Sequence, residues 1–142
     1  MRKILFLDID GVCNSAAFAE KTKHKGVLGI DPVPAKLVRD IQRVTGCEVV
    51  LSSTWRLSNS DRAMVREQVV DFIDVTPDLN PDLRGAEIQD WLDRNPDVDR
   101  YAILDDDDDM LANQLENFFQ TTWEDGLTQE IAVKVAEHLN GV

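Results

Sequence analysis

The chain begins with an apolar run that ends in acidic residues. Residues 3–7, KILFL, are followed by Asp8, Asp10 and Gly11. A continuous apolar run of this length predicts a strand that is buried on both faces, as strands of parallel sheets are. This feature favours a sheet covered by helices on both sides and places two carboxylates at the point where the strand ends.

The same pattern recurs further along the chain. A segment with helical spacing at about 34–45, ended by Gly46, precedes a second apolar run at 49–51. Strand, helix and strand in this order predict a parallel crossover. A third apolar run, 101–104, leads directly into five consecutive aspartates, 105–109.

The remaining periodicity predicts further alternation of helices and strands. Residues 13–33 and 76–83 show no helical or strand pattern and are expected to be loops. The sequence therefore predicts a Rossmann-like, three-layer α/β/α fold with a mainly parallel sheet, built as one domain from residues 1–142. The other expected elements are helices at about 60–70, 85–94 and 110–115, strands at 72–75 and 118–122, and a last helix capped by Thr128.

Composition excludes several classes of function. The formal net charge is −12 and the sequence pI about 4.4, so the chain lacks the positive field that general binders of nucleic acids or anionic membranes need. No apolar run approaches the roughly 20 residues of a membrane span. We expect a cytoplasmic protein, and its two cysteines, Cys13 and Cys47, are too few for a disulfide scaffold.

Polar residues follow each of the three apolar strands. Ligands of open parallel sheets bind beyond the carboxyl ends of the strands, where this sequence places Asp8 and Asp10, Ser52, and the aspartates from Asp105. Carboxylates gathered so closely repel one another unless a cation lies between them, and hard oxygen ligands suit Mg²⁺. The sequence therefore predicts a magnesium site that handles a phosphate group, with Asp8 as nucleophile and Asp10 as proton donor.

These residues resemble the four motifs of the haloacid dehalogenase (HAD) superfamily. The motifs are a hydrophobic strand with Asp8-Ile9-Asp10-Gly11-Val12, a strand with Ser52, a basic residue near a helix start at Arg84, and a strand with Asp105-Asp106. More narrowly, FLDIDGVCNS, VVLSSTWR, LRGAEIQDWL and ILDDDDDM are similar to the phosphatase-like domain of Swiss army knife RNA-repair proteins.

The resemblance implies a role for each motif residue. Asp8 would carry an aspartyl-phosphate and, with the backbone carbonyl of Asp10, bind Mg²⁺, while the Asp10 side chain would act as acid and then base. Ser52 and Arg84 would hold the phosphoryl group. Asp106 would complete the magnesium shell, with Asp105 ligating or orienting beside it.

Several neighbouring residues are further candidates for binding the substrate: Gly11, Ser53, Arg56 and Lys23. Ser53 and Thr54 compete with Ser52 because the exact end of the strand is uncertain, and Arg56 competes with Arg84. Lys23 belongs to a basic cluster, 21–25, that could attract an anion or be a plain exposed loop. Trp55 is expected to be a packing residue, and a role for Asp109 at the metal is left open.

The intervals between the motifs are too short to hold a folded cap domain, so we expect an open site. Open sites suit large substrates, and the resemblance points to a nucleic-acid end. The net charge argues that a long polyanion would bind weakly. Alternatives are a phosphatase of nucleotides or small molecules and a binding domain without turnover. A phosphorylatable receiver domain is disfavoured because Ser52 and Ser53 stand where it needs an aspartate.

Overall fold

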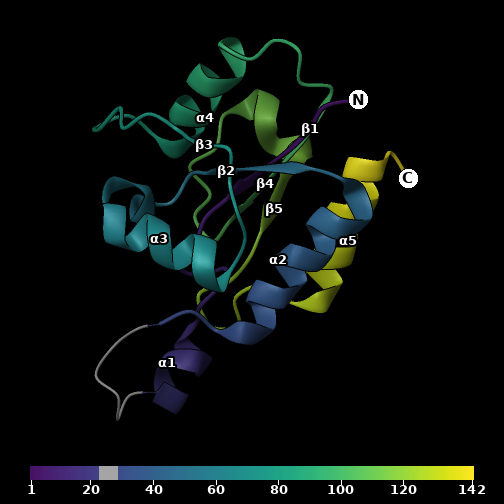
Figure 1. The fold of residues 1–142 in the computed structure, drawn as a ribbon. Coiled ribbons are helices and arrows are strands. Elements are labelled where there is room, and N and C mark those ends of the chain that lie inside the picture. The colour runs from purple at the N-terminus through teal and green to yellow at the C-terminus, as the bar shows by residue number, and fades with distance from the viewer. Residues whose placement is uncertain (23–28) are drawn as a thin grey trace.

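The fold is built on one parallel sheet. The computed structural model describes residues 1–22 and 29–142. In that part of the chain five strands pair in the order β3-β2-β1-β4-β5, and every pair is parallel (Figure 1). The strands are β1 (Lys3–Leu7), β2 (Glu48–Leu51), β3 (Asp74–Val75), β4 (Arg100–Asp105) and β5 (Phe118–Gln120).

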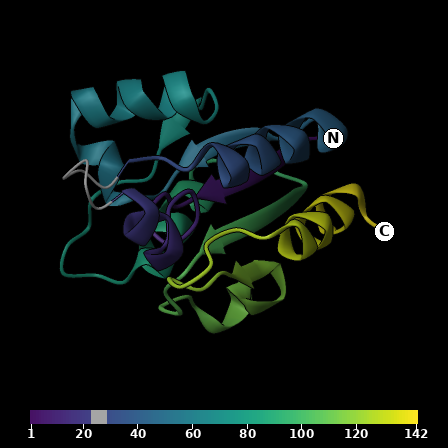
Figure 2. The ribbon, with the colours of Figure 1, turned by 90° about the horizontal axis from the view of Figure 1, so that it is seen from below.

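Helices cover both faces of this sheet, which confirms the predicted three-layer α/β/α architecture (Figures 1 and 2). On one face, α2 (Pro32–Thr45), α3 (Asn59–Gln68) and α5 (Gln129–Asn140) contribute to the larger core. On the other face, α4 (Arg84–Asp93) packs through Ile88 and Trp91. Two 3₁₀ helices complete the described elements, η2 (Thr54–Leu57) and η3 (Ala112–Asn117).

The central strand, β1, shows why four consecutive residues, Ile4 to Leu7, are apolar. In β1, Leu5 and Leu7 enter the core beneath α2, α3 and α5. Ile4 and Phe6 enter the core beneath α4, where the Phe6 ring meets that of Trp91 edge to face at a centroid distance of 5.5 Å. Alternate residues of a strand face opposite sides of a sheet, so a strand covered on both sides must be apolar at every position.

Three local predictions were wrong. The stretch 13–33 contains a helix, α1 (Ala16–Thr22), which has no fully buried residue and therefore lacks the apolar periodicity that marks a helix. The expected helix at 110–115 is instead η3, which begins later, and Leu115 is exposed. The strand expected at 72–75 is reduced to β3.

Two intervals of the chain, one after β1 and one after β2, separate the predicted motifs. Between β1 and α2 the described chain holds only α1, and between β2 and α4 it holds η2, α3 and β3. In the described residues neither interval contains a folded cap, as expected. Within those same residues no helix has the length and hydropathy required to cross a bilayer.

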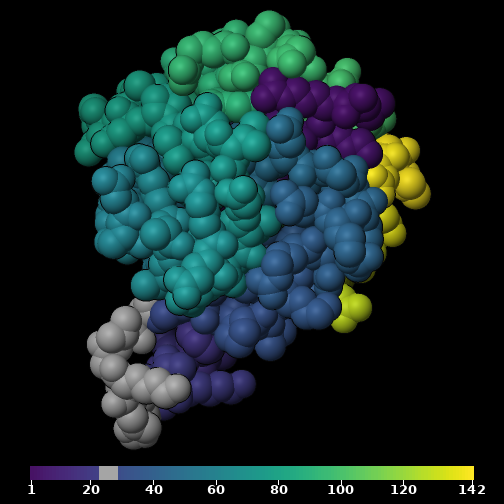
Figure 3. Space-filling model, in the orientation of Figure 1, coloured from purple at the N-terminus to yellow at the C-terminus, as the bar shows by residue number. Residues whose placement is uncertain are grey.

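The two ends of the chain lie together, remote from the carboxyl ends of the strands. Lys3 Nζ donates a hydrogen bond to Asn140 Oδ1 at 3.0 Å. In the space-filling view the first residues, in purple, lie close to the yellow C-terminal helix (Figure 3). The carboxyl ends of β1, β2 and β4, which carry the motif residues, lie at the opposite end of the sheet (Figure 1).

Candidate active site

The register of the sheet brings the three strand ends side by side. Leu7 is the register partner of both Leu51 and Leu104, so the next residues along the three strands, Asp8, Ser52 and Asp105, lie next to one another. Backbone hydrogen bonds continue this alignment past the strand ends: Asp8 N donates to Leu104 O and Ser52 N to Leu7 O, both at 3.0 Å. Parallel pairing thus gathers side chains that are more than 40 positions apart in sequence.

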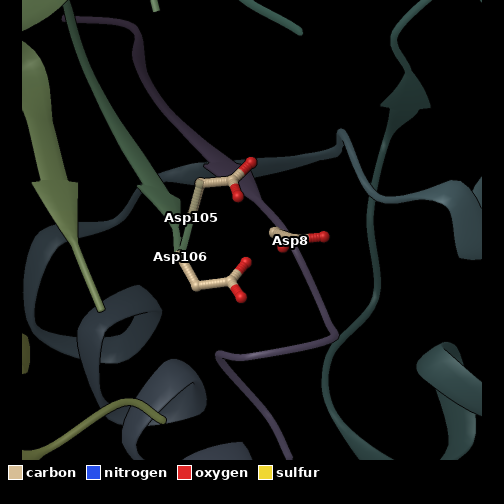
Figure 4. Close-up of side chains that lie close together, drawn as sticks. All are labelled: Asp8, Asp105 and Asp106. Carbon is tan, nitrogen blue, oxygen red and sulfur yellow. The ribbon is translucent and has the colours of Figure 1, made fainter. Parts of the chain in front are cut away.

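Three aspartates form an acidic cluster at this point. One carboxylate oxygen each of Asp8, Asp105 and Asp106 lies within 4.8 Å of the others (Figure 4). Asp8 and Asp105 are buried, whereas Asp106 is partly exposed. Three hard oxygen donors at this spacing form a group that could hold a metal ion.

Gly11 permits the close approach of Asp106. It adopts φ +81°, and a Cβ built there would lie 2.7 Å from Asp106 Cβ and closer still to the carboxylate. The Gly11 N–H donates to Asn14 Oδ1 at 2.9 Å. The structure therefore gives this glycine a steric role, and its expected part in binding the substrate stays a prediction.

Arg84 is the cation of the site. It stands at the first position of α4, and its Nη1 lies 3.0 Å from Asp8 Oδ1 and 2.8 Å from Asp105 Oδ2. Its backbone N–H donates to Asp109 Oδ2 at 3.1 Å. Asp109 therefore serves the start of α4, and within the described chain the acidic cluster does not include it.

Burial and mutual repulsion perturb the ionisation of this group. Desolvation, reinforced by the Asp105 charge, raises the pKa of Asp8 well above its ordinary value although Arg84 acts against the shift. Burial raises the pKa of Asp105 to about 6, again with Arg84 opposing. For Arg84, burial favours the neutral form, but the charges of Asp8 and Asp105 outweigh it and raise its pKa.

The formal charges of the acidic cluster and Arg84 do not balance. Three ionised carboxylates and one guanidinium sum to −2. One divalent cation would balance this charge. The residues present therefore fit a bound Mg²⁺, both in donor chemistry and in charge.

Asp10 lies apart from the acidic cluster and has its own partners. Its Oδ1 accepts hydrogen bonds from Trp55 Nε1 at 3.0 Å and from Asn14 Nδ2 at 2.9 Å. Among the described acids, the metal-binding group does not include the Asp10 carboxylate. Its expected metal contact, through the backbone carbonyl, stays a prediction.

The two serines after β2 differ in their surroundings. Ser52 is fully buried, and in the described part of the chain its Oγ has no hydrogen-bond partner. Ser53 Oγ accepts a hydrogen bond from Trp55 N at 3.2 Å and caps η2. Ser52 is thus the hydroxyl left open for a ligand, whereas Ser53 has a structural task.

Arg56 was expected to contact the substrate. It lines a cavity beside Arg84, but its guanidinium is already bound to protein groups, and the contact stays a prediction. The residue is 2% exposed, and all five of its N–H groups point at protein acceptors. Nε donates to Thr76 O at 2.9 Å, and Nη2 forms a buried ion pair with Glu87 Oε2 at 3.0 Å. Its remaining acceptors are the backbone oxygens of Ser52, Ser53 and Pro77. Arg56 therefore ties η2 to the loop after β3 and to α4.

Two further expectations concern the flanks of the site. Lys23 lies outside the residues that the structure describes. Asp107 and Asp108, which precede the helix expected at about 110–115, are exposed after the end of β4, and η3 begins only at Ala112. Sequence reasoning missed Asn14, although it lies only four residues after Asp10. It assigned Trp55 to packing, because a hydrogen bond between Asp10 and a residue 45 positions away leaves no local pattern.

The comparisons with known proteins agree with this geometry. A family model described as the HAD domain in Swiss Army Knife RNA repair proteins matches residues 4–132. The chain belongs to this family. The matched range includes the positions of all the predicted motif residues, from Asp8 to the aspartates after β4. Searches of curated proteins and of solved structures gave no match.

Proposed function

We propose that this HAD domain is a Mg²⁺-dependent phosphomonoester hydrolase that works through an aspartyl-phosphate on Asp8. One observation carries the proposal. The buried Asp8 carboxylate lies 3.0 Å from Arg84 and within 4.8 Å of two further carboxylates. A carboxylate nucleophile, a cation and a metal-binding pair at one strand end are the parts that phosphoryl transfer to aspartate needs.

Asp8, Asp105 and Asp106 would hold the magnesium ion. When bound, the ion supplies positive charge that keeps the buried carboxylates ionised and draws the phosphoryl oxygens towards Asp8. This matters because burial favours the neutral form of Asp8, and only the carboxylate is a nucleophile.

The chemistry divides between Asp8 and Asp10. One oxygen of Asp8 attacks phosphorus, the phosphorus–oxygen bond of the ester breaks, and Asp10 gives its proton to the leaving oxygen. In the second step Asp10 takes a proton from water, the water oxygen attacks the phosphorus of the acyl phosphate, and the Asp8 carboxylate is released with inorganic phosphate.

Ser52 and Arg84 would bind the phosphoryl oxygens. The Ser52 hydroxyl is buried with no partner in the described chain, and leaving such a group unsatisfied is costly. Arg84 is already held beside Asp8 and can donate from other positions of its guanidinium. We therefore assign both residues to charge stabilisation during transfer.

For the substrate we propose the phosphorylated end of a nucleic acid. The family match to RNA-repair domains supports this class, and so does a site without a folded cap in the described residues. Beside Arg84 a cavity of about 220 Å³ is lined by Asp78, Asn80 and Asp82, among others. The lining carries four carboxylates and only two arginines, Arg56 and Arg84, so it would repel a run of further phosphates and the polymer would be held mainly at its end.

A small phosphorylated molecule is the second candidate. The cavity beside Arg84 is large enough for a compact group such as a sugar, and its carboxylates and amide suit hydroxyl groups. Such a substrate needs no basic surface, which agrees with the net charge of −12.

The test is phosphate release with Mg²⁺ from p-nitrophenyl phosphate and from oligonucleotides phosphorylated at the 3′ or the 5′ end. We expect release by the wild type and none by Asp8→Asn. Asp93→Asn, an exposed substitution of the same type on α4, is the matched control and should be as active as the wild type. Absence of turnover with every substrate, or full activity of Asp8→Asn, would contradict the mechanism.

A further inference from the structure

Asp10 is held by two donors that both reach the same oxygen. Trp55 Nε1 and Asn14 Nδ2 donate to Asp10 Oδ1 at 3.0 and 2.9 Å. We propose that Trp55 and Asn14 are positioning residues that leave Asp10 Oδ2 as the oxygen that transfers the proton. This inference rests on the proposed function, because it assumes that Asp10 is the acid and base of a phosphatase.

The chemistry of the donors decides which oxygen can carry the proton. An indole N–H and an amide NH₂ donate hydrogen bonds and cannot accept them here, so the oxygen that receives both must be unprotonated. The orientation of the Asn14 amide is fixed independently, since its Oδ1 accepts the N–H of Gly11 at 2.9 Å. When Asp10 is protonated, its proton is therefore on Oδ2.

The two donors are themselves held firmly. Asn14 is fully buried, and its Nδ2 also approaches Gly29 O at 3.4 Å. Trp55 lies on η2, where Ser53 Oγ caps its backbone N–H. The next residue, Arg56, fixes η2 through its five N–H groups. A carboxylate bound to such anchors cannot rotate without losing two hydrogen bonds, which is the condition for a preorganised proton donor.

The dependence of kcat/KM on the leaving group distinguishes a positioning role of Trp55 from a purely structural one. Nitrophenolate leaves readily without a proton, whereas the more basic phenolate depends on the acid. Trp55→Phe keeps the aromatic ring and removes the N–H. We expect it to lower kcat/KM for phenyl phosphate about tenfold, a part of the roughly 10²–10⁴-fold supplied by general acids, and to change that for p-nitrophenyl phosphate less than about twofold.

The chain offers a matched control in its other buried indole. Trp91 Nε1 also donates to an aspartate, Asp74 Oδ2 at 2.8 Å, but in the core beneath α4. Trp91→Phe should therefore leave the ratio of the two kcat/KM values unchanged, even where it lowers stability. If Trp55→Phe does not fold, Asn14→Ala removes the second donor and should change the ratio in the same direction.

A double mutant tests whether Trp55 acts through Asp10. In the Asp10→Asn background, Trp55→Phe should change the ratio no further, because the acid is already absent. Two results for Trp55→Phe would overturn the proposal. An equal loss of kcat/KM on both esters would indicate general damage to the site, and a gain of kcat/KM on phenyl phosphate would indicate that the indole N–H hinders proton transfer by Asp10. The proposed function fails separately, when the wild type hydrolyses neither ester.

Discussion

Replacing Gly11 by alanine tests whether the backbone beside Asp8 must be bare for the metal site to form. Gly11 has φ +81°, a left-handed conformation that costs an L-residue about 1–2 kcal/mol. The new Cβ would also lie 2.7 Å from Asp106 Cβ. Ordinary carbon contacts are about 3.5 Å and the carboxylate lies closer still, so Asp106 must retreat by at least roughly 0.8 Å.

The two effects predict separate magnitudes. Conformational strain and crowding together should lower the free energy of unfolding by about 2–5 kcal/mol. A displacement of nearly 1 Å in a group that holds the metal should lower the Mg²⁺-dependent kcat/KM by about 10–100-fold. It should also raise the Mg²⁺ concentration needed for half-maximal activity by about 10-fold or more.

Gly46→Ala separates strain from displacement. Gly46 caps α2 with φ +71°, and a Cβ there would meet nothing within 4 Å. Gly46→Ala should therefore lower the free energy of unfolding in urea by about 1–2 kcal/mol and leave the Mg²⁺ concentration for half-maximal activity unchanged. If Gly11→Ala behaves like Gly46→Ala in both assays, Asp106 does not depend on the bare backbone, and the reasoning is refuted.

Three more predictions follow from contacts at the site. Ser52→Ala should change the free energy of unfolding in urea by less than about 1 kcal/mol and reduce kcat/KM about 100-fold. Ser53→Ala should lower the free energy of unfolding by about 1 kcal/mol, because it removes a helix cap, and should reduce kcat/KM less. The reverse pattern would exchange the roles of the two serines. Arg56→Ala should destabilise the protein by about 3–5 kcal/mol because it leaves Glu87 buried and unpaired; unchanged stability with a raised KM would instead indicate a substrate contact. Burial raises the pKa of Asp105 to about 6 in the folded protein without metal, above its value in the unfolded chain. As pH rises from about 4 to about 6, the unfolded chain therefore loses this proton before the folded protein does, and the free energy of unfolding falls. Mg²⁺ should therefore raise Tm more at about pH 7.5 than at about pH 5, and an equal shift at both would contradict this.

The fold could be predicted because local sequence patterns mark most of its strands and helices. β1 is apolar from Ile4 to Leu7 since both faces are covered, and α2 ends at a glycine in the left-handed conformation. The strand ends carrying Asp8, Ser52 and Asp105 follow from the rule that parallel strands expose their carboxyl ends at one edge. Helix α1 escaped prediction because it buries no residue fully, so no apolar stripe marks it.

What each side chain does at that edge depended on the tertiary structure. The sequence placed two arginines as candidates to bind a phosphate. Only the tertiary structure directs the Arg56 guanidinium to backbone oxygens and to Glu87 on α4, and places Arg84 beside Asp8. The sequence likewise placed Asp105, Asp106 and Asp109 in one run. Only the path of the chain at the end of β4 places Asp105 and Asp106 in the acidic cluster and Asp109 at the start of α4. The sequence by itself therefore determined the residue types and the edge at which they meet. Their roles were decided by hydrogen bonds between distant segments, which no local pattern encodes.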